Sequence, residues 1–331
     1  MSQETSQDRI EREFAVGAPA KLSVGNIRGS VDIQAGPDGV IQVVAVKRLD
    51  TGDAERTEIV VEQAADGSVK VETRLGSPAG WFTSWQPCAV DYTVRVPRQC
   101  LLAARVVSSA LLARGMTGEV SINAVSGEVT LGDLSGDLKF KTVSGNLTGD
   151  ALTGSLRLDT VSGGVRLRQC RFDAIDARTV SGNVSIETPL LAGAQTYRLK
   201  SVSGDITLVF PAATRCAVEG HSLSGRLRTN LPSQPQRAGL SGRRWRVDVS
   251  AGEGQDEAAS PAQVTFDSVS ANLILNVAGD AIVHEAVREA AHPTPLPAPA
   301  SASGPSHSEI LDRVARGEMT VDDAIGVLTN R

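Results

Sequence analysis

The 331-residue sequence predicts an all-β fold, a β-solenoid with coils of about 18 residues and two strands each, followed by a small C-terminal helical hairpin. A phrase of Val or Leu, Ser or Thr, and Gly recurs every nine residues from Met116 to Val161, with a degenerate copy at Val107. Each Gly is followed by alternating polar and apolar residues, which is typical of a strand with one buried face. Stacked coils of this kind would enclose one continuous core.

Later copies of the phrase begin at Val180, Val202 and Leu223, at steps close to twice nine, so a complete coil has two halves. We expect Gly to supply a positive φ at each turn. One inner ladder is expected to contain Val129, Leu147, Val165, Val184, Ile206 and Leu227, with Leu138 and Leu156 on the opposite wall. The serines expected to stack at one corner are Ser126, Ser144, Ser162, Ser181, Ser203 and Ser224. The alternative is a β-sandwich whose turn phrases fall at equal spacing by coincidence.

The N-terminal part lacks the nine-residue step. Residues 1–13 are polar and charged and are predicted to be disordered, and the solenoid domain is predicted over 14–285. Within it, residues 14–100 form an irregular start and residues 101–283 form the repeats. Alternation in the irregular start predicts strands at Lys21–Val24, Ser30–Gln34, Val40–Lys47, Thr57–Glu62, Ser68–Arg74 and Val90–Val96. Their pairing would protect one end of the solenoid from edge-to-edge association.

An aromatic loop interrupts these strands. Trp81, Phe82 and Trp85 lie within five residues and include two of the three tryptophans of the chain. This much aromatic surface could form a contact patch for a protein or a membrane surface. The favoured alternative is a lid folded over the open end of the core.

An insertion over residues 226–265 breaks the rhythm of the repeats. Within it, Arg243 and Arg244 stand beside Trp245, a combination that could bind an acidic partner. We favour a solvated hairpin that bulges from one coil, because acidic residues follow between Ser250 and Pro261. Strand pairing is expected to resume at Gln263–Phe266 and Asn272–Asn276, where Ala271 replaces the usual Gly.

The C-terminal tail has two parts. Residues 286–307 are rich in Pro, Ala and Ser and are predicted to be an extended linker. Residues 308–331 carry two short helical patterns, whose apolar positions are Ile310, Leu311, Val314, Val321, Ile325 and Leu328. Helices this short are unstable alone in water, so we expect the hairpin to mediate self-association or the capture of a protein partner.

Composition limits the class of protein and its compartment. The net charge of −5 argues against nucleic-acid binding, which usually needs a basic face. The four cysteines fall at no metal-ligand or disulfide spacing, as expected in a reducing cytoplasm. The sequence shows no secretory signal peptide and no apolar run long enough to span a bilayer. We therefore expect a cytoplasmic protein, with peripheral association at the inner face of a membrane left open.

The sequence offers no assembled catalytic chemistry. Of the four histidines, only His221 lies within the repeats, while His284, His292 and His307 lie at the end of the solenoid domain or in the tail. Neither a Ser-His arrangement nor a His-rich metal site can therefore form, and we expect no catalytic residue, cofactor or metal. A calcium-binding β-roll needs stacked aspartates, whereas the position after each Gly varies from Glu128 to Asn146 to Arg226. A carbohydrate-active β-helix needs an acidic pair on one outer face, which positions such as Thr130 do not supply.

The repeat phrases resemble a known family. Val125-Ser126-Gly127-Glu128-Val129 and Val202-Ser203-Gly204-Asp205-Ile206, preceded by Tyr92-Thr93-Val94-Arg95-Val96-Pro97, are similar to a family of candidate bacterial adhesins built from β-strand repeats, a domain of unknown function. The tail from Ile310 to Leu328 is similar to a short C-terminal helical module of the SHOCT type. The resemblance implies a non-enzymatic β-solenoid linked to envelope maintenance or stress response in bacteria.

These observations together predict a scaffold or interaction protein and not an enzyme. The solenoid would present a rigid polar face, and the C-terminal hairpin would contact a second copy or a different protein. The alternatives are a bactofilin-like cytoskeletal polymer formed by end-to-end stacking of solenoids and a carbohydrate-active β-helix enzyme.

Overall fold

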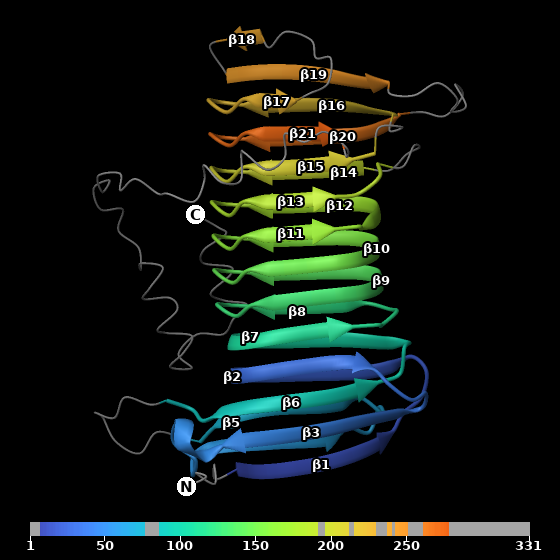
Figure 1. Ribbon diagram of the computed structural model, residues 1–331, viewed down its shortest axis with the longest axis vertical. Helices are drawn as coiled ribbons and strands as arrows, with labels where there is room; N and C mark the ends of the chain where they lie inside the picture. The colour runs from blue at the N-terminus through green and yellow to red at the C-terminus, as the bar shows by residue number, and fades with distance from the viewer. Residues whose placement is uncertain are drawn as a thin grey trace, which may run out of the picture.

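The computed structural model describes residues 7–76, 86–190, 196–211, 215–229, 237–239, 242–250 and 261–277. Within these ranges the chain forms twenty-one strands and one 3-10 helix, Leu49–Thr51, so the all-β prediction is confirmed. The strands stack into a long flattened solenoid whose coils follow one another along the long axis (Figure 1). The predicted linker at 286–307 and hairpin at 308–331 lie outside the described residues.

The strands fall into three regions of the chain. The N-terminal strands are β1 Gln7–Ala15, β2 Ala20–Ala35, β3 Val40–Arg48, β4 Thr57–Gln63, β5 Val69–Leu75 and β6 Ala89–Val96. The central strands are β7 Cys100–Arg114, β8 Val120–Ala124, β9 Val129–Thr142, β10 Leu147–Thr160, β11 Val165–Arg168, β12 Arg171–Thr179, β13 Val184–Glu187, β14 Thr196–Ser201 and β15 Ile206–Phe210. The last strands are β16 Arg215–Ser222, β17 Leu227–Thr229, β18 Arg237–Gly239, β19 Gly242–Ser250, β20 Ala262–Ser268 and β21 Leu273–Val277.

Each coil contributes one strand to each of two walls. Wall A consists, in stacking order, of β8, the second halves of β9 and β10, and then β12, β14, β20, β16 and β19. Wall B consists of the first halves of β9 and β10, and then β11, β13, β15, β21 and β17. Neighbouring strands are parallel except for β19, which runs antiparallel to β16.

The apolar ladders fill the space between the walls. The predicted members on wall B pair in register and are buried from Val129 to Ile206, and Leu138 pairs with Leu156 on wall A. Leu227 does not follow Ile206 directly, because Leu273 of β21 lies between them. The last two strands of the described chain are therefore inserted between two earlier coils, and stacking order departs from sequence order there.

The turns from wall A to wall B are closed by side-chain hydrogen bonds. Ser144 donates its backbone N–H to Val125 O at 2.8 Å and its hydroxyl to the same oxygen at 3.2 Å. Equivalent contacts confirm the predicted serine stack. The residue before the phrase also contributes, since buried Thr179 donates its hydroxyl to Gly182 O at 2.7 Å. The same contact recurs at Thr142, Thr160, Ser201 and Ser268.

The glycines of these turns are required for a different reason from the predicted one. The positive φ expected at Gly145 is wrong, as it is for the other Val-Ser-Gly turns. A Cβ atom on Gly145 would instead lie 2.1 Å from the carbonyl oxygen of Gly127 in the coil before it. The predicted positive φ is confirmed for the phrase glycines at the opposite bend of the coil, Gly118, Gly136 and Gly154. The Val-Ser-Gly glycines therefore permit close approach of stacked backbones.

Antiparallel strands close the N-terminal end. The first half of β2 pairs with β5, and the second half pairs with β6. β4 then pairs antiparallel with β5, and β3 pairs antiparallel with β6. β1 pairs antiparallel with β3 from Gln7 to Ala15, so the prediction of disorder is wrong for residues 7–13. Ile10 and Phe14 of β1 pack against the core. The strands predicted in the irregular start are confirmed.

The insertion closes the other end. β18 and β19 form a hairpin, and β19 pairs with β16 over eight residues, from Arg215 opposite Ser250 to Ser222 opposite Arg243. β19 therefore lies along the edge of wall A, where its backbone pairs with β16, and the described part of the hairpin does not bulge from one coil. No helix of the described residues is long and apolar enough to cross a membrane.

Candidate functional site

The outer face of wall A is lined by charged side chains, because strands alternate inward and outward residues. Each wall A strand in the stack from β9 to β19 contributes two outward residues, two positions apart in sequence. These residues align with those of the neighbouring strands and form two rows across the wall. In stacking order these pairs are Lys139 and Lys141, Arg157 and Asp159, Asp176 and Arg178, Arg198 and Lys200, Thr265 and Asp267, Glu219 and His221, and Arg246 and Arg244.

Basic residues dominate this face. The two aligned rows hold eight Lys and Arg side chains against four Asp and Glu, whereas the whole chain has a net charge of −5. Between β12 and β19 the face is hollowed into an open groove of about 890 Å³, and a second hollow of about 430 Å³ continues it toward β9. Asp176 and Arg198 line both hollows, so the groove is continuous along the stack.

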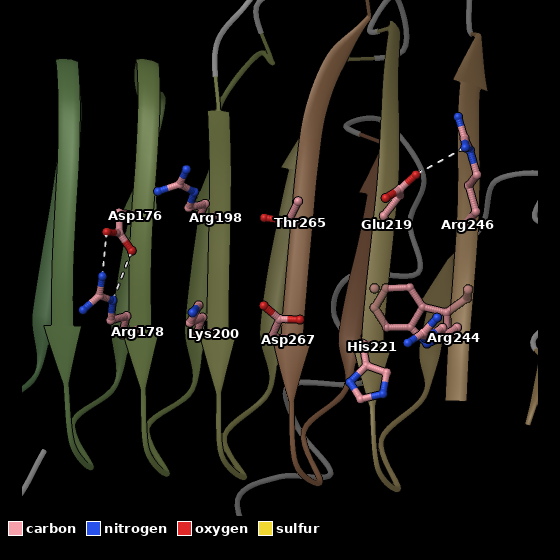
Figure 2. Close-up of a pocket in the computed structure, with 12 residues that line it drawn as sticks. Asp176, Arg178, Arg198, Lys200, Glu219, His221, Arg244, Arg246, Thr265 and Asp267 are labelled. Atoms are coloured by element: carbon pink, nitrogen blue, oxygen red, sulfur yellow. Dashed lines mark hydrogen bonds and ion pairs between the residues drawn. The ribbon is translucent and has the colours of Figure 1, made fainter. Parts of the chain in front are cut away.

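Ion pairs fix the two ends of the main groove. Asp176 lies 3.0 Å from Arg178, and Glu219 lies 3.2 Å from Arg246 (Figure 2). Asp176 also lies 3.4 Å from Arg157 of β10. These contacts are exposed and contribute little stability, but they hold the side chains in place along the groove.

The middle of the groove has uncompensated positive charge. Arg198 and Lys200 of β14 are exposed, and neither forms an ion pair or hydrogen bond with the residues that the structure describes. Asp159, farther along the same face, is partly buried, and burial raises its pKa while Arg178 and Lys141 oppose the shift. Within the described residues, both outward side chains of β14 are therefore unpaired cations at the middle of the groove.

An aromatic side chain underlies one end of the groove. Trp245 of β19 is only 4% exposed, and its ring stacks on Phe266 at a centroid distance of 5.5 Å. Gly220 of β16 makes room for the ring, since a Cβ there would lie 1.2 Å from Trp245 Cζ3. The indole Nε1 is buried and has no hydrogen-bond partner within the described part of the chain.

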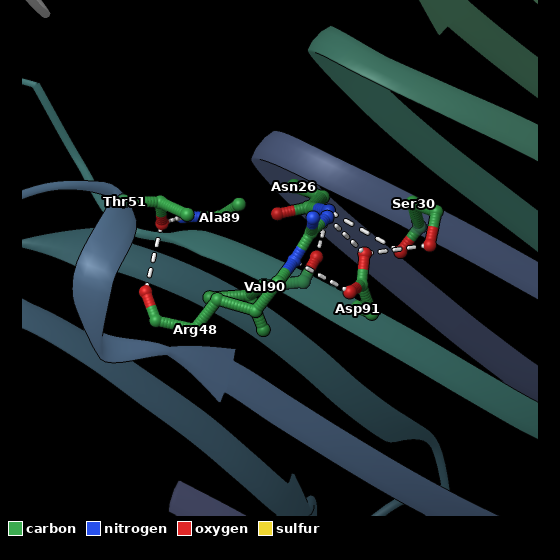
Figure 3. Close-up of polar contacts among 7 residues, drawn as sticks. All are labelled: Asn26, Ser30, Arg48, Thr51, Ala89, Val90 and Asp91. Carbon is green, nitrogen blue, oxygen red and sulfur yellow. Dashed lines mark hydrogen bonds and ion pairs between the residues drawn. The ribbon is translucent and has the colours of Figure 1, made fainter. Parts of the chain in front are cut away.

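A second polar cluster, at the N-terminal end, is structural. Buried Asn26 donates to Val90 O at 2.8 Å, and Asp91 accepts from Ser30 at 2.7 Å and from Arg48 at 3.0 Å (Figure 3). These bonds join β2, β3 and β6 where the two walls begin. Every member is engaged within the protein, so the cluster offers no open site for a ligand.

The interaction residues predicted from sequence have different outcomes. Arg244 is exposed and lines the groove, whereas Trp245 also lines it but is almost entirely buried. Arg243 belongs to β19, where it pairs with Ser222. Trp81, Phe82, Trp85 and the six apolar residues of the tail lie outside the described residues.

Sequence reasoning missed the other groove residues. Their local signal is a pattern of two polar residues on either side of one buried residue, as in Arg198-Leu199-Lys200 or Asp176-Ala177-Arg178. This pattern is common to strands with one buried face and does not by itself indicate a groove. The groove is assembled by register, and β20 enters it from a segment more than sixty residues beyond β14 in sequence. Among the described residues, no group of three or more His, Cys, Asp or Glu could hold a metal ion.

The fold and this face define a two-walled β-solenoid with capped ends and a charged outer groove. The chain belongs to the Toastrack DUF4097 family, which matches residues 21–249. The matched range includes wall A as far as β19 but not β20 and β21. No curated protein matches the chain.

Solved structures of similar proteins have low sequence identity. One is a candidate adhesin from Bacteroides fragilis, with 10% identity, a TM-score of 0.42, and coverage of 82% of this chain and 98% of that one. Another is a candidate lipid-binding protein from Parabacteroides distasonis, with 12% identity, a TM-score of 0.41, and coverage of 82% and 96%. A candidate cell adhesion protein from Clostridium sporogenes has 10% identity, a TM-score of 0.28, and coverage of 82% and 100%.

Proposed function

We propose that the protein is a non-enzymatic interaction scaffold linked to bacterial cell-envelope maintenance or stress response. The solenoid presents the outer face of wall A, and residues 308–331 bind a second copy or a partner protein. The main support is the continuous charged groove on a wall whose strands are fixed on both sides by neighbouring coils. Such a wall holds side chains at regular spacing, which suits recognition of an extended partner. The envelope assignment rests on the family resemblance, and cell fractionation tests it.

The domain boundaries of this scaffold are also a proposal. The solenoid domain would extend to residue 285, the linker would occupy 286–307, and the tail would fold as a helical hairpin of the SHOCT type. The linker would hold the tail away from the solenoid, so that the tail can bind a partner, because Pro-rich segments act as extended spacers.

The tail proposal is tested by comparing the full chain with a chain that ends at Ser306. Removal of the tail should leave the melting temperature of the solenoid nearly unchanged and lower the oligomeric mass in light scattering or abolish partner capture. Ile325→Ser on the apolar face should reproduce the loss, whereas Asp322→Ser on the polar face should not. Identical mass and capture with and without the tail would refute its role.

A further inference from the structure

We propose that the groove on wall A binds a linear acidic polysaccharide, one that carries carboxylate or sulfate groups along its length. This inference goes beyond the scaffold role, because it names a ligand and does not involve the tail.

The shape of the groove fits one extended polymer chain. Seven strands from β9 to β19 contribute to it, and strands in a sheet are about 4.8 Å apart, so the aligned rows extend over roughly 29 Å. The rows are only two residues apart along each strand, about 7 Å. A strip this long and narrow matches a single polymer strand that lies along the solenoid axis. A nucleic-acid duplex or the plane of a bilayer would need a broader basic surface.

The order of charges identifies the kind of polymer. Arg198 and Lys200 offer uncompensated cations, and β20 beside them presents Thr265 and Asp267, a neutral hydroxyl and a carboxylate (Figure 2). The cations can bind acidic groups, and the carboxylate can accept hydrogen bonds from sugar hydroxyls. A polymer with a negative charge on every unit and no hydroxyl donors would be repelled at β20. Acidic polysaccharides carry both kinds of group.

The aromatic content of the groove disfavours single-stranded nucleic acid. Such ligands are usually bound by exposed aromatic rings that stack on the bases. Among the described residues that line the groove, Trp245 is the one Trp, Tyr or Phe side chain, and its ring is covered and stacked on Phe266. Recognition through charge and hydrogen bonds therefore fits the described side chains better than recognition through base stacking.

The decisive variant removes the two uncompensated cations of β14, as Arg198→Ser with Lys200→Ser in one chain. The matched control is Arg166→Ser with Arg168→Ser on β11, which removes two exposed cations with the same spacing from wall B. Both pairs are exposed, so both variants should fold, as circular dichroism would verify. Affinities of the full chain for polygalacturonate, dextran sulfate and neutral dextran would be measured by calorimetry at two salt concentrations.

We expect the β14 variant to bind the acidic polysaccharides at least about tenfold more weakly than the parent, because two charge-assisted contacts are lost. The β11 variant should bind like the parent, and neutral dextran should not bind either protein. Asp267→Asn should not strengthen polysaccharide binding. The substitution removes a negative charge that repels the acidic groups, but it also replaces a carboxylate with a weaker acceptor for the sugar hydroxyls.

Three results would overturn the proposal. The first is no binding of the acidic polysaccharides by the parent chain, and the second is an equal loss in the β14 and β11 variants. The third is tighter binding of oligo-dT or phosphatidylglycerol vesicles than of polysaccharide, with the same dependence on Arg198 and Lys200. Because these measurements do not involve residues 308–331, their failure leaves the tail hypothesis standing, and failure of the tail experiment leaves this one standing.

Discussion

Single residues at the turns determine how closely the coils can stack. The repeat pattern identified the glycines that the turns require. A positive φ and a close approach of two backbones both select glycine, however, so the residue type alone does not show which of the two applies. Only the register of the coils distinguishes them, because it places the carbonyl oxygen of Gly127 under Gly145. Ala271 occupies the equivalent position in the inserted coil, so a methyl group is tolerated at that turn.

We expect Gly145→Val to destabilise the solenoid by more than the roughly 1 kcal/mol typical of an unstrained glycine. The added Cβ would lie 2.1 Å from Gly127 O, so one coil must shift and lose ladder hydrogen bonds. Gly17→Val is the matched control, since nothing lies within 4 Å of a Cβ built there. Chemical denaturation of both variants measures the difference, and equal stabilities would refute the close-approach explanation.

Buried acidic groups should make the fold sensitive to alkali. Burial raises the pKa of Cys100 to about 12 from its ordinary value of 9.0, and it raises the pKa of Cys170 to about 11. The unfolded chain therefore loses these protons at lower pH than the folded chain does. Their contribution to stability is complete below pH 9 and is lost as the pH rises toward the folded values, by up to about 1.4 kcal/mol per pH unit for each thiol.

Cys100→Ala should consequently show a shallower fall in unfolding free energy between pH 9 and 11 than the parent, under reducing conditions. The comparison uses slopes, so the cost of the smaller side chain does not affect it. A variant with the same slope as the parent would show that the pKa of Cys100 in the folded protein is no higher than that of a thiol in the unfolded chain.

At the scale of elements, β19 determines how wall A ends. Its pairing with β16 could not be predicted from sequence, because the insertion has no repeat phrase and the acidic residues after Ser250 suggested a solvated segment. The alternation of Arg244, Trp245, Arg246 and Val247 was nevertheless present, and it identifies a strand with one buried face. The position of β20 and β21 in the stack could not be predicted either, because the local sequence does not indicate with which coils these two strands pair.

A double-mutant cycle at Gly220 and Trp245 tests this cap. Trp245→Ala should destabilise the protein by about 3–5 kcal/mol, as expected for a buried tryptophan. Gly220→Ala should be costly in the parent, because the new methyl group overlaps the indole ring, and far less costly when Trp245 is already Ala. Additive effects of the two changes, within about 0.5 kcal/mol, would contradict the observed packing.

At the scale of the whole molecule, the nine-residue step was sufficient to predict a solenoid, its two-strand coil and its continuous core. The step could not predict the ends, because end strands pair on one side only and need no repeat. Both ends of the described solenoid are closed by antiparallel strands, β1, β3 and β4 at one end and β19 at the other. This arrangement disfavours the bactofilin-like polymer, since no complete parallel coil is exposed for another copy to extend.

The edge at β1 gives this argument a direct test. The exposed residues of β1 include Asp8, Arg9, Glu11 and Glu13, and charged edge strands discourage pairing with other chains. β3 beneath it reads Val40–Arg48 with apolar residues at most positions, so its uncovered edge would be a template for association. We expect a chain lacking residues 1–16 to form oligomers whose mass in light scattering rises with concentration, whereas removal of residues 1–6 alone should change nothing. Filaments of the full chain in electron microscopy, or a truncated chain that stays monodisperse, would show that β1 does not protect this end.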